Sequence, residues 1–402
     1  MNLYVKTGKT LLEKLNDHGF EAYFVGGFVR DFLLQIPSTD IDIATSATPD
    51  QVAALFPDTK ETGLKFGTVT VRLDGFSYEV TTFRTDGTYQ DSRHPVDVSY
   101  AKTLAEDLVR RDFTVNALAM DRLGRIIDLC EGERDLRAKV LRAIGDPDRR
   151  FQEDALRILR AFRFIAKLDF ALETATADSI FRNRFRLQSV SIERIMQELK
   201  AIVAHPFSVH ALKAMVECGI DAVFPDLGSG IRFLSKQPAL SLDLLQFYAL
   251  CFHLQGEGIP DEWRFSNKEK AIIRQLTDLL EVTRDDQYHE ELVYAYGKNM
   301  CLKANEISRL LAPERDQEQR ILAIDENLPI RKTCDLAFKG QDLLRETPVS
   351  DARMIGEIIS DLVLMVITRQ LPNQYEPLKQ HALRKLAEWD SEGNDHGNER
   401  IL

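Results

Sequence analysis

One stretch near the N-terminus most narrows what this chain can fold into. Residues 22–44, AYFVGGFVRDFLLQIPSTDIDIA, predict a strand, a double glycine, a short helix, a turn and a second strand. On that second strand Asp40 and Asp42 flank Ile41, so alternation puts both carboxylates on one face and Ile41 into the core. Two acids opposite a Gly-Gly turn form a suitable place for a divalent metal and a triphosphate.

The expected secondary structure changes along the chain. Strand-like runs occur at residues 22–25, 40–44, 68–73, 77–83 and 112–120, and helical periodicity dominates after about residue 145. We therefore expect an α+β protein, with a small mixed sheet followed by an all-α region. The 402 residues are too many for one ordinary core. The polar residues 84–100 predict a long functional loop, and the polar residues 390–402 predict disorder.

Composition limits the classes of protein to which the chain can belong. The net charge of −11 argues against indiscriminate nucleic-acid binding, although a local basic surface remains compatible with it. No apolar run approaches the about 20 residues of a membrane span, so we expect no membrane contact. The five cysteines are odd in number and lack CxxC spacing, which excludes that metal or redox motif and favours a cytoplasmic location.

A third carboxylate is expected beside the pair on the second strand. Glu79 lies between Tyr78 and Val80 in a run with the same alternation, which predicts a neighbouring strand. Three unpaired carboxylates gathered on a sheet repel one another, and a cation relieves that repulsion. Asp40, Asp42 and Glu79 therefore predict an oxygen site suited to Mg²⁺, which binds few carboxylates together with substrate phosphates.

Cationic groups near the double glycine are candidates for holding the phosphates. Gly26 and Gly27 end an apolar strand and open a helix, so their backbone N–H groups can approach a phosphate without obstruction by a Cβ atom. Arg30, one turn later, can add a fork of donors. Arg111 is the stronger candidate of the adjacent pair Arg110 and Arg111, which could equally be ordinary surface charge.

One helix, expected over residues 151–164, carries a regular stripe of charges. Its apolar face consists of Leu156, Leu159, Phe162 and Ile165. Its charges recur every three residues at Asp154, Arg157, Arg160 and Arg163. Such a stripe can simply form ion pairs along an exposed helix surface.

The same stripe can also read a nucleotide base. An arginine donates to a ring nitrogen and an aspartate accepts from an exocyclic amine. Cytosine and adenine both offer that amine beside an acceptor nitrogen, whereas uracil and guanine offer a carbonyl beside an N–H. Asp154 with Arg157 would thus accept C and A and reject U and G.

The region around this helix is more basic than the rest of the chain. Residues 149–200 contain 11 Lys and Arg against 7 Asp and Glu. Arg182, Arg184 and Arg186 alternate within it and could face RNA phosphate or form a solvated loop. The following segment, SIERIMQELK, predicts a helix capped by Ser191 that packs against the base-reading helix.

Taken together, these motifs resemble a known family. Residues 20–205 contain, in this order, VGGFVRD with DIDI, YEVTTFR, RRDFTVNALA, GDPDRRFQEDALRILRAFRF and SIERIMQELK. Their combination resembles the class II tRNA nucleotidyltransferases, or CCA-adding enzymes, and the related bacterial poly(A) polymerases. The stretch DLAFKGQDLL is similar to a weaker signature in the C-terminal region of that family.

The resemblance implies an architecture and a set of residue roles. A polymerase-β-like nucleotidyltransferase head would span residues 1–145, followed by a helical neck at 146–205, a body at 206–325 and a tail at 326–402. Asp40 and Asp42 would bind the metal ions, and Glu79 would be a third catalytic carboxylate. The nucleotide-binding residues would be Gly27, Arg30 and Arg111 for triphosphate and ribose, and Asp154, Arg157, Arg160 and Arg163 at the base.

The resemblance also implies the reaction and the partners. Two Mg²⁺ ions would serve nucleotidyl transfer, one activating the 3′-hydroxyl of tRNA and the other holding the triphosphate and stabilising pyrophosphate. CTP and ATP would be the substrates, and body and tail would grip the tRNA acceptor arm. The sequence leaves a homodimer open.

Other activities remain open at this point. The loop at residues 84–100 has the length that accompanies addition of C, C and A in this family, rather than C and C alone. Bacterial poly(A) polymerase or A-only addition to tRNA is the alternative. A nucleotidyltransferase for a small molecule or protein would not need the long helical region, and an inactive RNA-binding relative would not need the intact Asp40 and Asp42 pair.

Overall fold

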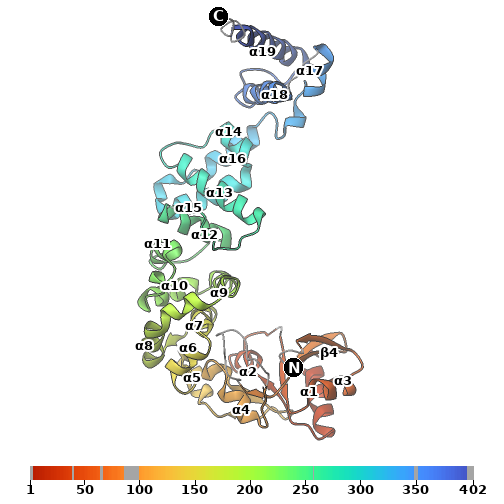
Figure 1. The fold of residues 1–402 in the computed structure, drawn as a ribbon, viewed down its shortest axis with the longest axis vertical. Coiled ribbons are helices and arrows are strands. Elements are labelled where there is room, and N and C mark those ends of the chain that lie inside the picture. Colours follow the sequence, from red (N-terminus) through yellow and green to blue (C-terminus); the bar gives the residue numbers. More distant parts are fainter. Residues whose placement is uncertain are drawn as a thin grey trace, which may run out of the picture. The chain divides into compact units, whose positions relative to one another are not determined.

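The computed structural model describes residues 3–38, 40–63, 67–85, 99–256, 258–347 and 352–395 (Figure 1). The chain forms two compact units. The first comprises Met1–Leu244 with Pro260–Arg264, and the second comprises Leu245–Ile259 with Phe265–Leu402. Every strand within the described ranges belongs to the first unit. No described helix is both long and apolar enough to cross a lipid bilayer.

A seven-stranded mixed sheet forms the centre of the N-terminal region. Its strands, in spatial order, are β3 (Thr59–Gly63), β4 (Thr68–Leu73), β5 (Phe76–Thr82), β2 (Asp42–Thr45), β1 (Ala22–Val25), β8 (Leu118–Met120) and β9 (Ile126–Asp128). Only the β2–β5 pair of this sheet is parallel. The sheet is therefore mixed, as the sequence predicted. Sequence reasoning missed β3 and β9, which are short or weakly alternating.

Helices cover both faces of this sheet. They are α1 (Leu3–Asp17), α2 (Gly27–Leu33), α3 (Pro49–Leu55), α4 (Leu104–Val109) and α5 (Gly132–Ala138). Helices α1 and α3 pack on one face, and Leu11, Leu12 and Leu15 of α1 are fully buried (Figure 1). On the other face Leu104 and Leu108 of α4 pack against Val25 and Ala44. Burial on both sides fixes the register of the central strands.

The prediction of a strand over residues 112–120 is mostly wrong. A 3-10 turn (Thr114–Asn116) precedes β8, so only the last three residues of that run form a strand. The alternation of apolar and polar residues wrongly indicated a strand with one exposed face, because the intervening polar residues are buried as well. Thr114 donates to Asp135 (2.8 Å) and Asn116 donates to Asp112 (2.9 Å), so both are satisfied inside the protein.

The long polar loop is partly structured. Its ends form two short antiparallel strands, β6 (Arg84–Thr85) and β7 (Ser99–Tyr100), where the sequence predicted no regular structure. Residues 86–98 lie outside the described residues. The inference drawn from the length of this loop rests on those residues, so it stays a prediction.

Helices dominate the rest of the first unit, as expected. They are α6 (Pro147–Glu153), α7 (Leu156–Leu168), α8 (Thr174–Asn183), α9 (Ile192–Ala204), α10 (Ser208–Glu217) and α11 (Pro225–Leu234), with a 3-10 helix at Arg184–Ser189. A short parallel pair, β10 (Val140–Leu141) with β11 (Ala171–Leu172), is the exception. Helix α9 packs against α7, and Ser191 is its N-cap residue, as predicted, although the Ser191 hydroxyl makes no capping hydrogen bond.

The single helix expected over residues 151–164 is two helices. Helix α6 ends at Glu153, and Asp154 has extended backbone angles (φ −147°, ψ 104°). The carboxylate of Asp154 accepts a hydrogen bond from the N–H of Leu156 (3.0 Å), so it stabilises the start of α7. The predicted apolar face is confirmed, because Leu156, Leu159, Phe162 and Ile165 are all buried.

The second unit is entirely helical within the described residues. Its helices are α12 (Leu244–Gln255), α13 (Asn267–Val282), α14 (Glu290–Tyr296), α15 (Lys298–Leu311), α16 (Glu318–Asn327), α17 (Gly340–Glu346), α18 (Ala352–Ile367) and α19 (Tyr375–Asp395). The predicted disorder from residue 390 is wrong for residues 390–395, which continue α19, and residues 396–402 lie outside the described range.

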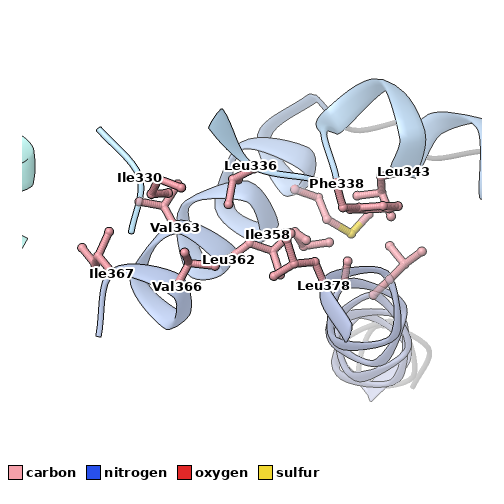
Figure 2. Close-up of a cluster of buried hydrophobic side chains, with 13 residues drawn as sticks. Ile330, Leu336, Phe338, Leu343, Ile358, Leu362, Val363, Val366, Ile367 and Leu378 are labelled. Atoms are coloured by element: carbon pink, nitrogen blue, oxygen red, sulfur yellow. The ribbon is translucent and has the colours of Figure 1, made fainter. Parts of the chain in front are cut away.

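A separate hydrophobic cluster holds the last three helices together (Figure 2). Leu362 of α18 is fully buried among side chains from α17, α19 and the segment before α17. Three of the five apolar residues of the DLAFKGQDLL motif, Leu336, Phe338 and Leu343, belong to this cluster. That motif is therefore a packing signature of the C-terminal region.

Replacing a central side chain of this cluster should destabilise the C-terminal helices. Leu362→Ala removes buried methyl groups and leaves a cavity, which costs about 2–5 kcal/mol. Leu344→Ala, at an exposed position of α17, should cost under about 0.5 kcal/mol. Urea unfolding of both variants measures the difference, and equal losses would contradict the packing described.

Candidate active site

A cavity of about 770 Å³ in the first unit gathers most of the predicted site residues. The predicted residues in its lining are Gly27, Arg30, Asp42, Glu79, Arg111, Asp154, Arg157, Arg160 and Arg163, whereas Asp40 lies outside it. The lining contains nine Lys and Arg side chains against five carboxylates. This excess of positive charge suits a polyanionic ligand such as a nucleoside triphosphate.

Two of the predicted catalytic carboxylates, Asp42 and Glu79, lie on adjacent strands, as predicted. Strands β2 and β5 run parallel with Asp42 directly opposite Glu79. The predicted start of this strand at residue 40 is wrong, because β2 begins at Asp42. Ile41, just before the strand, is buried while Asp40 is exposed, as the sequence predicted. Burial first, and the negative charge of Glu79 second, raise the pKa of Asp42, with Arg111 opposing and Asp40 adding to the shift. The site thus holds negative charge that a cation would relieve.

These carboxylates fit a metal that is completed by its substrate. Among the described residues, no three His, Cys, Asp or Glu side chains lie close enough together to hold a metal ion between them. Mg²⁺ typically takes one or two carboxylates together with substrate phosphates, so Asp40 and Asp42 suffice for that mode of binding. The role of Glu79 as a third ligand stays a prediction.

The double glycine forms a turn that lies directly against an arginine. Gly26 has a φ of +67°, and a Cβ atom there would lie 2.7 Å from Nη1 of Arg111. Asp107, which is buried, accepts hydrogen bonds from both Arg110 (2.7 Å) and Arg111 (3.0 Å). The Nε atom of Arg111 is buried without a hydrogen-bond partner among the described residues. An anion over the turn would satisfy that donor.

Arg30 is held in a buried chain of hydrogen bonds. It donates to Asp31 (2.8 Å) and to the side-chain oxygen of Asn116 (2.6 Å). Asn116 donates to Asp112, which also accepts a hydrogen bond from Arg160 of α7 (2.8 Å). Burial alone would raise the pKa of Asp112, but Arg160 and Asn116 together lower it to about 2. The phosphate-turn helix is thus coupled to the predicted base-reading helix.

Asp154 and Arg157 each have their own protein partners. Asp154 accepts a hydrogen bond from Arg194 of α9 (2.8 Å) as well as from the Leu156 N–H. Arg157, which is buried, donates to Glu153 (2.8 Å) and to backbone carbonyl oxygens. The simple alternative of an exposed stripe of ion pairs therefore does not describe this helix. Both side chains line the cavity in orientations fixed by their neighbours.

Arg163 occupies a partly desolvated position at the end of the stripe. It pairs with Glu198 of α9 at 3.3 Å. Burial, followed by the charge of Arg160, lowers the pKa of Arg163, while burial raises the pKa of Glu198. The Oε2 atom of Glu198 has no hydrogen-bond partner among the described residues. Glu198 does not itself line the cavity, so it holds Arg163 from behind the cavity wall.

Several residues that shape the cavity were missed from the sequence. Predicted site residues are held directly, through hydrogen bonds or ion pairs, by Glu153, Asp107, Asp112, Asn116 and Arg194. Lys167 acts one step farther away, through Asp31, which accepts a hydrogen bond from Arg30. Most of these pairs join positions far apart in the chain, so no local pattern reveals them. Arg194 was the most accessible to prediction, because it lies in a helix that was expected to pack against α7.

The basic cluster after α8 has partners within the protein. Arg182 pairs with Asp148 (2.7 Å), Arg186 donates to Asn183, and the guanidinium of Arg184 lies over the rings of Phe181 and Phe185. The sequence left RNA contact or a solvated loop open for these arginines, and the phosphate role stays a prediction.

Comparisons with known proteins agree with this geometry. A Poly A polymerase head domain model matches residues 22–142, a model for the RNA and SrmB-binding site of polymerase A matches residues 169–230, and tRNA nucleotidyltransferase domain 2 matches residues 247–382. A CCA-adding enzyme of Anoxybacillus flavithermus is 38% identical, covering 95% of this chain and 98% of its own length. The chain belongs to the CCA-adding enzyme family.

Further relatives extend over nearly the whole chain. A CCA-adding enzyme of Geobacillus stearothermophilus is 36% identical, covering 91% of this chain and 93% of its own. The solved structure of the Bacillus stearothermophilus CCA-adding enzyme in complex with CTP is 31% identical with a TM-score of 0.83, covering 98% of this chain and 100% of its own. The expected family, α+β fold and tRNA nucleotidyltransferase activity are therefore confirmed, and this family uses a divalent metal.

The buried Asp112 carboxylate should make stability depend on pH. Its pKa is lowered on folding, so its contribution of about 2 kcal/mol is present above its ordinary value and is lost as pH falls towards about 2. We expect Asp112→Asn to be clearly less stable than the parent protein at pH 7 and the difference to shrink at pH 3. Asp58→Asn, at an exposed position, is the control. A difference that is constant with pH would contradict the assignment.

Removing one of the repelling carboxylates should stabilise the metal-free protein. The raised pKa of Asp42 means that its charged form is disfavoured in the fold, so Asp42→Asn removes an unfavourable charge at pH 7. We expect a rise of about 1–3 °C in the melting temperature without metal, together with loss of nucleotidyl transfer. A fall in melting temperature would show that Asp42 does not lie in a field of like charge.

Proposed function

We propose that this protein adds C, C and A to the 3′ end of tRNA from CTP and ATP, without a template, and releases pyrophosphate. One observation supports the proposal above all. A single cavity contains both the carboxylate pair Asp42 and Glu79 and the base-reading pair Asp154 and Arg157. Transfer chemistry and choice of base therefore occur within the reach of one bound nucleotide.

The hydrogen-bonding groups of Asp154 and Arg157 match the edges of the two bases added. Asp154 accepts from the exocyclic amine of C or A, and Arg157 donates to the adjacent ring nitrogen. With U or G, a carbonyl would face the carboxylate and an N–H would face the guanidinium. Such buried mismatches reduce binding strongly. Arg160 and Arg163 extend the nucleotide-binding wall from the same helix.

The opposite end of the cavity binds the triphosphate. Arg111, Arg30 and the backbone at Gly27 contact the phosphates and ribose, because they surround the turn after β1. Asp40 and Asp42 hold Mg²⁺, with Glu79 as a further carboxylate beside them. When bound, Mg²⁺ neutralises charge on the phosphates and assists deprotonation of the attacking hydroxyl. The protein groups orient the nucleotide for in-line attack.

The acceptor is tRNA, and the helical regions bind it. We assign residues 1–145 to the catalytic head, 146–205 to a neck that recognises the base, 206–325 to a body and 326–402 to a tail. Body and tail grip the acceptor arm, and the tRNA substrate puts the reaction in the cytoplasm. Poly(A) synthesis and A-only addition are not favoured, because the similar proteins are named CCA-adding enzymes.

An addition assay tests this function. The protein is incubated with Mg²⁺, single nucleoside triphosphates and tRNA that lacks CCA, ends in CC or is complete. We expect C, C and then A to be added, followed by a stop at complete tRNA. Continued addition of A to generic RNA would support a poly(A) polymerase instead.

Variants test the assigned roles in the same assay. Asp42→Ala should abolish transfer, and Arg157→Ala should reduce the preference for C and A over U and G by about 10–100-fold. Arg182→Ala, outside the cavity, is the matched arginine control and should keep the parent's selectivity. Unchanged selectivity in Arg157→Ala would refute the base-reading role.

A further inference from the structure

The phenol of Tyr4, on α1, connects the two strands that carry the transfer carboxylates. Its hydroxyl donates to the carbonyl oxygen of Ser77 on β5 at 2.9 Å. The same oxygen accepts a hydrogen bond from the N–H of Ile41 at 3.3 Å. Since Ile41 lies between Asp40 and Asp42, this contact reaches the backbone of the metal-binding segment.

This hydroxyl stands where a backbone hydrogen bond of the sheet would otherwise form. At the other end of the parallel β2–β5 pair, the N–H of Phe83 donates to the carbonyl of Thr45 (2.7 Å). In a parallel ladder the residues that face the neighbouring strand alternate, so Thr45 and Ile41 both face β5. A continued ladder would therefore join the N–H of Ile41 directly to the carbonyl of Ser77.

Insertion of the hydroxyl widens the sheet at this point. Two hydrogen bonds in series keep the Ile41 nitrogen and the Ser77 oxygen farther apart than the about 2.9 Å of a direct bond. Regular pairing accordingly begins only at Asp42, opposite Glu79. Asp40 therefore precedes the regular β2–β5 pairing and does not line the cavity, whereas Asp42 and Glu79 do.

Tyr4 is itself firmly held. Its ring lies 5.1 Å from the ring of Phe76 and 4.9 Å from that of Tyr78. The hydroxyl of Tyr78 donates to the carbonyl oxygen of Tyr4 at 2.7 Å. The Tyr4 hydroxyl can therefore impose a spacing on the strands instead of following their movement.

We propose that Tyr4 is a positioning residue for the divalent-metal site, setting the spacing of Asp40 and Asp42 through its bridge between Ile41 and Ser77. This inference rests on the proposed metal-dependent transfer. Tyr4 touches neither substrate nor metal in this assignment, and it acts only through the backbone of β2 and β5.

Tyr4→Phe tests the proposal, because it keeps the ring contacts and removes the bridge. Binding of Mn²⁺ is followed by electron paramagnetic resonance of the free ion, without nucleotide or tRNA. We expect the dissociation constant for Mn²⁺ to rise about tenfold, as for loss of a supporting contact in other metal sites. Activity should need more Mg²⁺ and recover at high Mg²⁺, with unchanged preference for C and A.

Tyr78→Phe is the matched control. It removes the hydrogen bond that anchors α1 to the same strand but leaves the Tyr4 bridge in place. We expect its Mn²⁺ affinity to stay within about twofold of the parent's. Equal affinities in all three proteins, or equal losses in both variants, would overturn the proposal. If the parent binds Mn²⁺ only together with nucleotide, the Mg²⁺ concentration that gives half-maximal transfer provides the same comparison of the three proteins. Failure of the parent protein to add nucleotides at all would instead refute the proposed function itself.

Discussion

The ion pair between the buried Asp112 and the partly exposed Arg160 is the contact on which the arrangement of the cavity depends. Asp112 follows the arginine pair beside the phosphate turn, whereas Arg160 lies on α7, and their atoms approach to 2.6 Å. Through Asn116 the same carboxylate also holds Arg30. A buried charge requires its partner, so separating the sheet region from α7 would leave Asp112 buried without compensation. This requirement keeps Asp42 and Glu79 around one cavity with the residues that we propose to read the base.

Charged side chains of two kinds line that cavity: cations that are paired with acids, and carboxylates that lie opposite one another. Cationic side chains are paired with acids that hold them in place, as Asp107 holds Arg110 and Arg111. The acids of β2 and β5 lie opposite one another, and the charge of Glu79 adds to burial in raising the pKa of Asp42. Fixed donors suit recognition of a base or phosphate, because little reorganisation is needed on binding. Unbalanced carboxylates suit a metal that arrives together with its nucleotide.

The sequence predicted the parts of the fold that local pattern controls. Alternation located β1, β2, β4 and β5, and it correctly set Glu79 on the strand beside Asp42. It failed at residues 112–120, because Thr114 and Asn116 are buried by distant partners that no periodicity records. It also missed the break at Asp154, where a side chain caps the next helix. Likewise, Arg194 and Asp154 meet across 40 positions, so their contact follows only from the packing of α9 on α7.

If Asp154 and Arg157 choose the base as proposed, the protein needs no RNA to distinguish the nucleotides. Equilibrium binding of CTP, ATP, UTP and GTP to the protein with Mg²⁺, in the absence of any RNA, is the decisive measurement. CTP and ATP should bind at least about tenfold more tightly than UTP and GTP, since only they match Asp154 and Arg157. Equal affinity for all four nucleotides would show that these residues do not choose the base.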